Sequence, residues 1–225
     1  MQKLSANLSI PVIAIDGPSA SGKGTVAERV AEILGYHYLD SGALYRIVAF
    51  AACKKNIAWN QSDMLGDIAE TLQISFAQGE IMLDGDCITN ALRSEEISRG
   101  ASEVAVYPQV RKALLNLQQS FRKTPGLVAD GRDMGSVVFT DATLKIFLTA
   151  SVELRAERRF KQLENKGINA SFDQILAHLQ QRDLRDSQRS TAPLIQSSDA
   201  MLLDTTHRNI DEAVAFVLAA YEKII

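Results

Sequence analysis

A glycine-rich loop between an apolar run and a helical pattern constrains this chain more than any other feature. Residues 10–16 form the apolar run, and residues 25–34 have the periodicity of a helix. Glycines let the backbone wrap around an anion with its N–H groups pointing inward, and the helix N-terminus adds positive charge. This order of elements predicts a binding site for a nucleoside triphosphate. The loop is Gly17-Pro18-Ser19-Ala20-Ser21-Gly22-Lys23-Gly24-Thr25.

The residue after the loop lysine departs from the usual pattern. Most loops of this kind have Ser or Thr there, where the hydroxyl ligates Mg²⁺. Here Gly24 occupies that position and Thr25 follows it. The Gly-Lys-Gly-Thr variant resembles the loop of nucleoside monophosphate kinases, in which the metal is held largely through water and phosphate. This resemblance argues against Thr25 as a direct metal ligand.

Composition excludes several other classes of protein. The chain has 225 residues, enough for one domain with insertions, and a net charge of −3, which argues against non-specific nucleic-acid binding. Cys53 and Cys87 lie far apart, so we expect neither a disulfide framework nor a zinc site. No apolar run reaches membrane-spanning length, and residues 1–15 lack a secretory layout. We expect a cytoplasmic protein that contacts neither membrane nor nucleic acid.

Strand-like and helix-like runs alternate, which predicts an α/β fold with three layers, α/β/α, and a mostly parallel central sheet. Near-continuous apolar runs are typical of strands that are covered on both faces. Asn209 is expected to cap the last helix. Besides the first strand and helix, we expect strands at 36–40, 126–130, 144–148 and 201–204, and helices at 43–54 and 209–224.

Residues 60–105 do not follow this alternation of strand-like and helix-like runs. Short strands are expected at 74–76, 79–83 and 84–88, with a hairpin turn at Asp84-Gly85. We interpret them as a small antiparallel insertion in the main domain.

Two polar clusters follow expected strands and would face the same crevice as the phosphate loop. In residues 40–46, Ser41 either caps a helix or contacts a ligand, and Arg46 would reach a phosphate at the helix start. In residues 129–135, Asp130 ends a strand where Mg²⁺ is commonly organised, and Arg132 and Asp133 would bind a phosphate and an amino group. The alternative for this second cluster is a charged turn with local ion pairs.

Arginines recur at helical spacing in the last third of the chain. Arg155, Arg158 and Arg159 share one helical face, and a second set comprises Arg182, Arg185 and Arg189. Because the guanidinium fork matches phosphate oxygens, this pattern favours phosphate binding over a solvated helix surface. We expect Arg155 and Lys161 to belong to the solvated surface. Arginines, one loop lysine and Mg²⁺ suffice for phosphoryl transfer, which needs positioning and charge neutralisation.

Five motifs occur together and in order, at residues 17–25, 39–46, 108–111, 129–135 and 182–189. Together they resemble the bacterial cytidylate kinases, a branch of the nucleoside monophosphate kinases among P-loop proteins, over nearly the whole chain. The resemblance implies transfer of the ATP γ-phosphoryl group to CMP or dCMP by an in-line, Mg²⁺-assisted reaction. We expect a monomeric chain with a core (9–40, 108–150 and 190–225), an acceptor-binding region (41–107), a lid (151–170) and a helix lining the acceptor site (171–189).

The resemblance also implies a role for each matching residue. The whole loop from Gly17 to Thr25, with Arg158 and Arg159 of the lid, would bind ATP, and Asp130 would organise water around Mg²⁺. The groups acting on the transferred phosphoryl would be Lys23, Arg132, Arg158 and Arg189. The acceptor would be held by Ser41, Arg46, Ser102, Arg111, Arg132, Asp133, Arg182, Asp186 and Arg189.

The chemistry of the base favours cytosine. A carboxylate such as Asp133 accepts from the exocyclic amino group, and Arg111 donates to N3 and O2, whereas uracil would present a carbonyl to Asp133. The alternatives are a kinase of the same fold acting on UMP, AMP or shikimate, and a GTP-binding switch. The switch would need a guanine-reading Asn-Lys-x-Asp motif, which the sequence lacks. Nothing in the sequence ranks CMP against dCMP.

Overall fold

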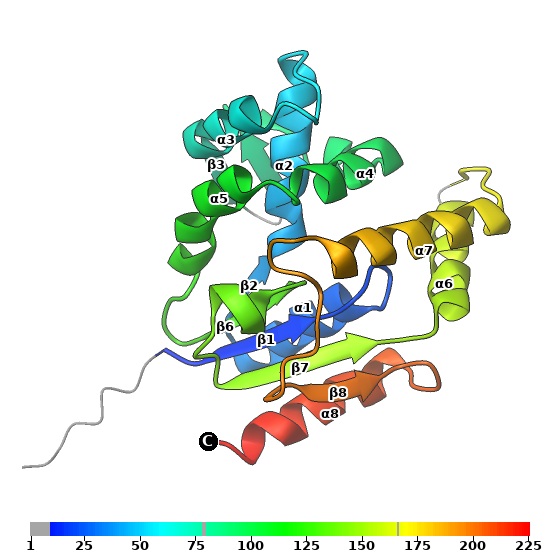
Figure 1. The fold of residues 1–225 in the computed structure, drawn as a ribbon. Coiled ribbons are helices and arrows are strands. Elements are labelled where there is room, and N and C mark those ends of the chain that lie inside the picture. The colour runs from blue at the N-terminus through cyan, green and yellow to red at the C-terminus, as the bar shows by residue number, and fades with distance from the viewer. Residues whose placement is uncertain (1–9, 78–79, 166) are drawn as a thin grey trace, which may run out of the picture.

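The computed structural model describes residues 10–77, 80–165 and 167–225 (Figure 1). Its centre is a five-stranded parallel sheet with the strand order β2-β6-β1-β7-β8. The central strands are buried on both faces, which explains why their sequences are nearly continuous apolar runs. The predicted sheet is confirmed. Its strands are Val12–Asp16 (β1), His37–Asp40 (β2), Leu127–Gly131 (β6), Leu144–Thr149 (β7) and Met201–Asp204 (β8).

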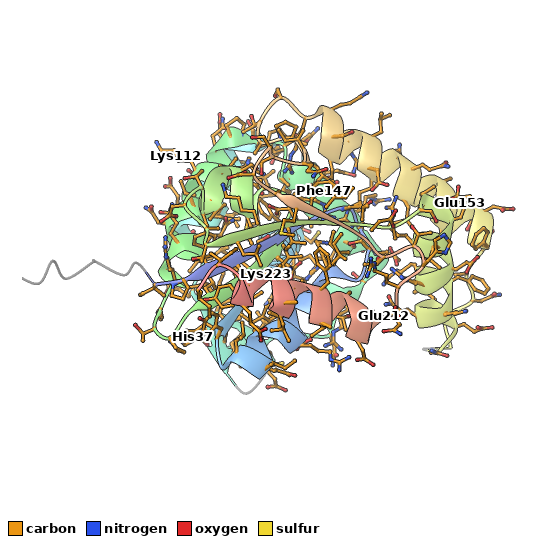
Figure 2. All side chains as sticks on the ribbon, turned by 90° about the horizontal axis from the view of Figure 1, so that it is seen from below. His37, Lys112, Phe147, Glu153, Glu212 and Lys223 are labelled. Carbon is orange, nitrogen blue, oxygen red and sulfur yellow. The ribbon has the colours of Figure 1, made fainter. Side chains whose placement is uncertain are left out.

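Helices cover both faces of this sheet. Helices α1 (Lys23–Leu34) and α8 (Ile210–Glu222) pack together on one face, which Figure 2 shows from below. Asn209 caps α8 as expected and exchanges hydrogen bonds with Glu212 in a capping box. On the other face lie α2 (Ser41–Lys54) and α5 (Pro108–Ser120). The three-layer arrangement is therefore confirmed.

The insertion contains the predicted antiparallel sheet and, in addition, helical elements before and after it. The sheet comprises β3 (Ile74–Ala77), β4 (Glu80–Leu83) and β5 (Asp86–Cys87), and Asp84 and Gly85 have the positive φ angles of a hairpin turn. The expected start of the middle strand at residue 79 lies outside the described residues. The predicted small antiparallel insertion is confirmed, and α3 (Ser62–Thr71), a 3₁₀ turn (Ala91–Arg93, η1) and α4 (Glu95–Val104) flank its strands.

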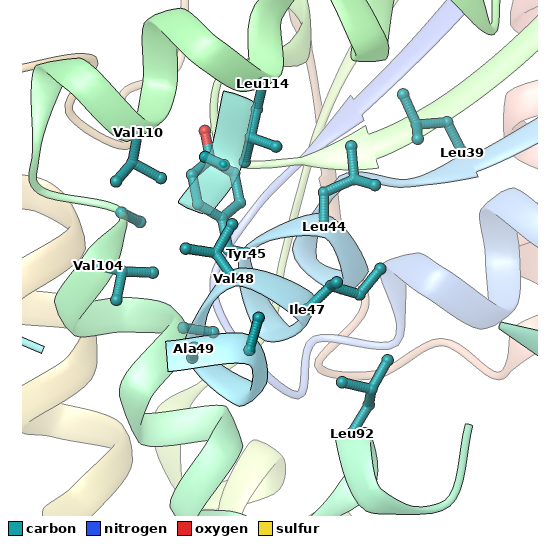
Figure 3. Close-up of a cluster of buried hydrophobic side chains, with 14 of the residues drawn as sticks. Leu39, Leu44, Tyr45, Ile47, Val48, Ala49, Leu92, Val104, Val110 and Leu114 are labelled. Atoms are coloured by element: carbon teal, nitrogen blue, oxygen red, sulfur yellow. The ribbon is translucent and has the colours of Figure 1, made fainter. Parts of the chain in front are cut away.

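These flanking helices join the insertion to the main core. Helix α3 packs on α5, and α4 packs on α2, because each presents an apolar face to its neighbour. Figure 3 shows Val104 of α4, Val48 of α2 and Val110 of α5 in one buried cluster. The acceptor-binding region is thereby anchored through α2 to the sheet.

The region expected to be a lid, residues 151–170, contains a helix, which packs against the helix expected to line the acceptor site. Helix α6 (Val152–Glu164) follows β7 and packs against α7 (Phe172–Gln188). Their shared core contains Ala156, Leu163, Ile175 and Leu179. In Figure 1 the pair stands at one end of the sheet, beyond the carboxyl end of β7. Among the described residues, every helix is too short or too polar to reach across a lipid bilayer.

Position 17 requires glycine, because the backbone of β7 passes very close to it. A Cβ added there would lie 1.9 Å from the backbone carbonyl oxygen of Leu148 in β7, and no rotamer change relieves a backbone clash. We therefore expect Gly17→Ala to lower the free energy of unfolding by about 3 kcal/mol or more. Urea denaturation followed by circular dichroism measures this loss.

The matched control is Gly24→Ala in the same loop, where an added Cβ would make only ordinary contacts of 3.6 Å and longer. Its free energy of unfolding should change by less than about 1 kcal/mol. Equal stability of the two variants would contradict the proposed clash.

Candidate active site

The carboxyl ends of β1, β2 and β6 bring the first polar groups together. The register pairs Asp16 with Gly131 and Asp40 with Asp130. Ser41 is buried, and its hydroxyl donates to the carbonyl oxygen of Asp130 over 2.8 Å. A Cβ at Gly131 would lie 2.5 Å from that hydroxyl, so the close approach requires glycine. The two polar clusters at residues 40–46 and 129–135 therefore meet at one edge of the sheet.

The cap of α2 is not Ser41, which was one of the two sequence-based alternatives for that residue. Asp40, not Ser41, caps the helix and accepts from the backbone N–H of Ala43 over 3.0 Å. Asp40 also forms an ion pair with Arg46. Ser41 is instead the first helical residue and binds across to β6, so its helix-cap interpretation is wrong.

The phosphate loop opens onto a cavity of about 500 Å³. Helix α1 begins at Lys23, two residues earlier than expected, because Gly22 has a left-handed backbone with φ of 92°. Lys161 is exposed, as expected, and also borders this cavity. The cavity is lined by Ala20, Ser21, Gly22, Lys23, Gly24, Thr25, Arg158, Lys161, Gln162 and Ile210.

Lys23 is largely buried, with the carboxylates of Asp130 and Asp40 and the cation of Arg132 near it. Its ammonium lies 4.0 Å from Asp130 Oδ1 and donates to the carbonyl oxygen of Pro18 over 3.4 Å. Burial, followed by the charge of Arg132, lowers the pKa of Lys23. Bound phosphate oxygens would restore the charged form of the lysine, so the loop is electrostatically suited to a polyphosphate.

Asp130 fits a cation held through water. Tyr38 donates its hydroxyl proton to Asp130 Oδ2 over 2.7 Å, and burial together with Asp40 raises the pKa of Asp130. Within the described ranges, no group of three or more His, Cys, Asp or Glu side chains is placed to hold a metal directly. Mg²⁺ commonly binds through one or two carboxylates, waters and substrate phosphates. One carboxylate beside a phosphate loop suits that mode.

Arg111 and Asp133 form a buried ion pair, although 22 residues separate them. Arg111 also donates to the carbonyl oxygen of Ala105 over 3.1 Å and lies over the ring of Tyr45. Burial raises the pKa of Asp133 despite its arginine neighbours. Arg189 Nη2 lies 4.0 Å from Asp133 Oδ1 and is buried without a hydrogen-bond partner. The predicted base-reading pair is thus in place, with an unused donor beside it.

Asp186 is the centre of a second buried network. It accepts from Arg132 Nε over 2.8 Å and from the Ser102 hydroxyl over 3.4 Å. Arg182 lies 4.0 Å away, and its Nε is buried without a hydrogen-bond partner. Burial, then the charges of Arg132 and Arg46, lowers the pKa of Arg182 to about 10, so it stays cationic at neutral pH. Converging cations with unused donors indicate an anionic ligand.

Two neighbouring arginines of α6, Arg158 and Arg159, contact different parts of the molecule. Arg158 donates to the carbonyl oxygens of Ser21 in the phosphate loop and Thr205 after β8, each over 3.0 Å. Arg159 instead forms an ion pair with Glu95 of α4. Of the two arginines expected to bind ATP, Arg158 lies beside the phosphate loop, whereas Arg159 contacts α4 instead.

Arg155 is a buried link rather than solvated surface, which corrects that expectation. It is 5% exposed. It donates to the carbonyl oxygens of Ser19 and Ala150 and pairs with Asp183 of α7 at 2.6 Å. Arg155 thereby connects α6 and α7 to the phosphate loop.

Comparison with known proteins decides the family. The family model described as cytidylate kinase matches residues 13–223. The chain belongs to the cytidylate kinase family. Cytidylate kinases of Polynucleobacter asymbioticus and Nitrosomonas europaea are 57% and 55% identical over 96% and 95% of this chain, covering 99% and 96% of their own lengths. The cytidylate kinase of Chromobacterium violaceum is 54% identical over 96% of this chain and 97% of its own length.

Sequence reasoning missed two polar groups in this cytidylate kinase family site. Tyr38 reaches Asp130 from β2, and no sequence signal points to that contact. Asp16 ends β1 and accepts from the backbone N–H groups of Met134 and Gly135. The sequence did offer one signal for Asp16, a carboxylate at the end of an otherwise apolar strand. A carboxylate buried there requires hydrogen-bond donors.

Proposed function

We propose that the protein is a cytidylate kinase that transfers the γ-phosphoryl group of ATP to CMP, giving CDP and ADP. The observation that carries this proposal is the buried Arg111–Asp133 pair close to a phosphate loop. The charge of Arg132 lowers the pKa of Lys23, so the two cations lie near each other, which supports their acting on one transferred phosphoryl group.

The reaction requires positioning and charge neutralisation more than covalent chemistry. The loop N–H groups hold the ATP phosphates, and Lys23 spans the donor and transferred groups. Arg132 and Arg189 approach from the acceptor side and Arg158 from the lid. Mg²⁺, when bound, neutralises phosphate charge, and Asp130 accepts hydrogen bonds from its waters.

The acceptor is held at three points. Asp133 accepts from the cytosine amino group, while Arg111 donates to N3 and O2, and Ser102 completes the contact with the base. Arg182 and Asp186 contact the ribose. The acceptor phosphate is held by Arg46 and Arg132, beside Ser41.

The remaining assignments follow from the same site. The same proposal has the protein act as a monomer on small nucleotides. Cys53 and Cys87 are exposed and form no disulfide, which supports a reducing compartment such as the cytoplasm.

An acceptor panel tests the proposed function. ATP-dependent diphosphate formation with Mg²⁺ is measured for CMP, dCMP, UMP, AMP and GMP at equal concentrations. We expect turnover of CMP, and of dCMP, to exceed that of UMP by about a hundredfold or more. Equal rates with UMP, or a preference for a purine, would overturn the cytosine assignment.

Replacement of Arg158 and of Arg159 should have different effects on KM for ATP. Arg158→Ala removes a charge beside the phosphate loop, and we expect KM for ATP to rise about tenfold. Arg159→Ala removes only an exposed ion pair with Glu95, so KM for ATP should change less than about twofold. Steady-state kinetics at saturating CMP compares them. An equal rise of KM in both variants would refute this division.

A further inference from the structure

Asp16 joins the strand before the phosphate loop to the turn that carries Arg132 and Asp133. It is the last residue of β1 and is 7% exposed. Its Oδ1 accepts from the backbone N–H of Met134 and its Oδ2 from that of Gly135, each over 2.8 Å. Both oxygens of the carboxylate therefore bind one turn.

That turn has no internal acceptor for these two N–H groups. Residues Met134–Val138 form a π-helical turn (η2), a rare geometry that occurs mostly at functional sites. Within it, Val137 and Val138 donate to the carbonyl oxygen of Asp133. The first N–H groups of a helical turn need an outside acceptor, and Asp16 supplies one oxygen to each.

A carboxylate meets this need in a way that an amide cannot. Asparagine would offer one accepting oxygen, and its NH₂ group would face the second backbone N–H donor. A buried donor without a partner destabilises the turn, so we expect the turn to move until that donor finds another acceptor. Since Asp133 begins the turn, such a movement displaces the carboxylate that faces Arg111.

We propose that Asp16 is a positioning residue for acceptor specificity. It holds the turn after β6 so that Asp133 keeps its ion pair with Arg111, and Arg132 keeps its ion pair with Asp186. This inference rests on the proposed function. Asp16 touches neither nucleotide and acts through the two backbone N–H groups.

Asp16→Asn tests the proposal. We expect the ratio of kcat/KM for CMP to that for UMP to fall about tenfold or more, with KM for ATP changed less than about twofold. The matched control is Asp204→Asn, because Asp204 also ends a strand and accepts from a backbone N–H, that of Thr206, but lies away from the acceptor. An unchanged ratio in folded Asp16→Asn would overturn the proposal.

A measurement on the unaltered protein covers the case in which Asp16→Asn does not fold. Burial raises the pKa of Asp16 to about 7. Of the nearby charges, Asp133 raises this pKa and Arg132 lowers it, while Lys145 of β7 is paired with Asp199. Above pH 7 both oxygens accept; as the pH falls through 7, one becomes an O–H donor. The CMP:UMP ratio should then be highest near pH 8 and decline toward pH 6.

The amide NMR signals of Met134 and Gly135 report the ionisation of Asp16 directly. The midpoint of their shift should coincide with the midpoint of the CMP:UMP ratio. Protonation of Lys23 or of the acceptor phosphate affects both nucleotides alike and cancels in the ratio. A flat ratio, or one with a different midpoint, would contradict the proposal. Lack of CMP preference in the unaltered protein at pH 8 would instead refute the proposed function.

Discussion

Replacing Lys23 by alanine is expected to lower kcat about a thousandfold or more, while the affinity for CMP stays within about threefold. The ammonium is the one buried cation that belongs to the phosphate loop itself, 4.0 Å from Asp130. Its charge is needed most when negative charge spreads over the transferred phosphoryl group. The acceptor is bound by other cations, so CMP binding does not depend on Lys23.

Single-turnover kinetics gives the rate of the chemical step, and calorimetric titration gives the affinity for CMP. Lys223→Ala is the matched control, because Lys223 is exposed at the end of α8, away from the site (Figure 2). A near-normal kcat in Lys23→Ala would refute the phosphate-loop mechanism.

Asp133→Ala should have the second large effect, a fall in kcat/KM for CMP of about a thousandfold. The variant loses the acceptor for the cytosine amino group and leaves Arg111 and Arg189 buried without their carboxylate. KM for ATP should stay nearly unchanged, since Asp133 lies on the acceptor side. The preference for CMP over UMP should largely disappear.

Steady-state kinetics with CMP and UMP, together with thermal unfolding, separates this effect from loss of stability. Asp141→Ala is the matched control, because Asp141 also pairs with an arginine, Arg122, but is exposed. It should keep both kcat/KM and the CMP preference. An Asp133→Ala enzyme that is folded and still prefers CMP would remove Asp133 from the base pocket.

The fold and the phosphate loop were predictable because their signals are local. Apolar runs give the strands, and the glycines around Lys23 give the loop. The meeting of residues 40–46 and 129–135 was predictable as well, because parallel strands that end together bring both segments to one edge of the sheet. The joining of Arg111 to Asp133 came from base chemistry and resemblance, and the structure places the two side chains together.

The remaining features depend on contacts that no local pattern encodes. Arg155 looks like a solvated helix residue, but its partner Ser19 lies 136 residues away. Asp16 and Met134 are 118 residues apart, and the need for an outside acceptor arises from a π-helical turn that the sequence does not announce. Arg159 follows Arg158 directly in the sequence, yet it pairs with Glu95 of α4 and not with the phosphate loop. Tertiary packing, rather than periodicity, decides these three cases.

The most direct test of the central claim is a competition in one vessel. ATP labelled at the γ-phosphate is mixed with equal amounts of CMP and UMP in the presence of Mg²⁺, and the labelled products are separated. The account predicts that the label appears in CDP, with little in UDP or in free phosphate. Label distributed equally between CDP and UDP, or released to water, would contradict it.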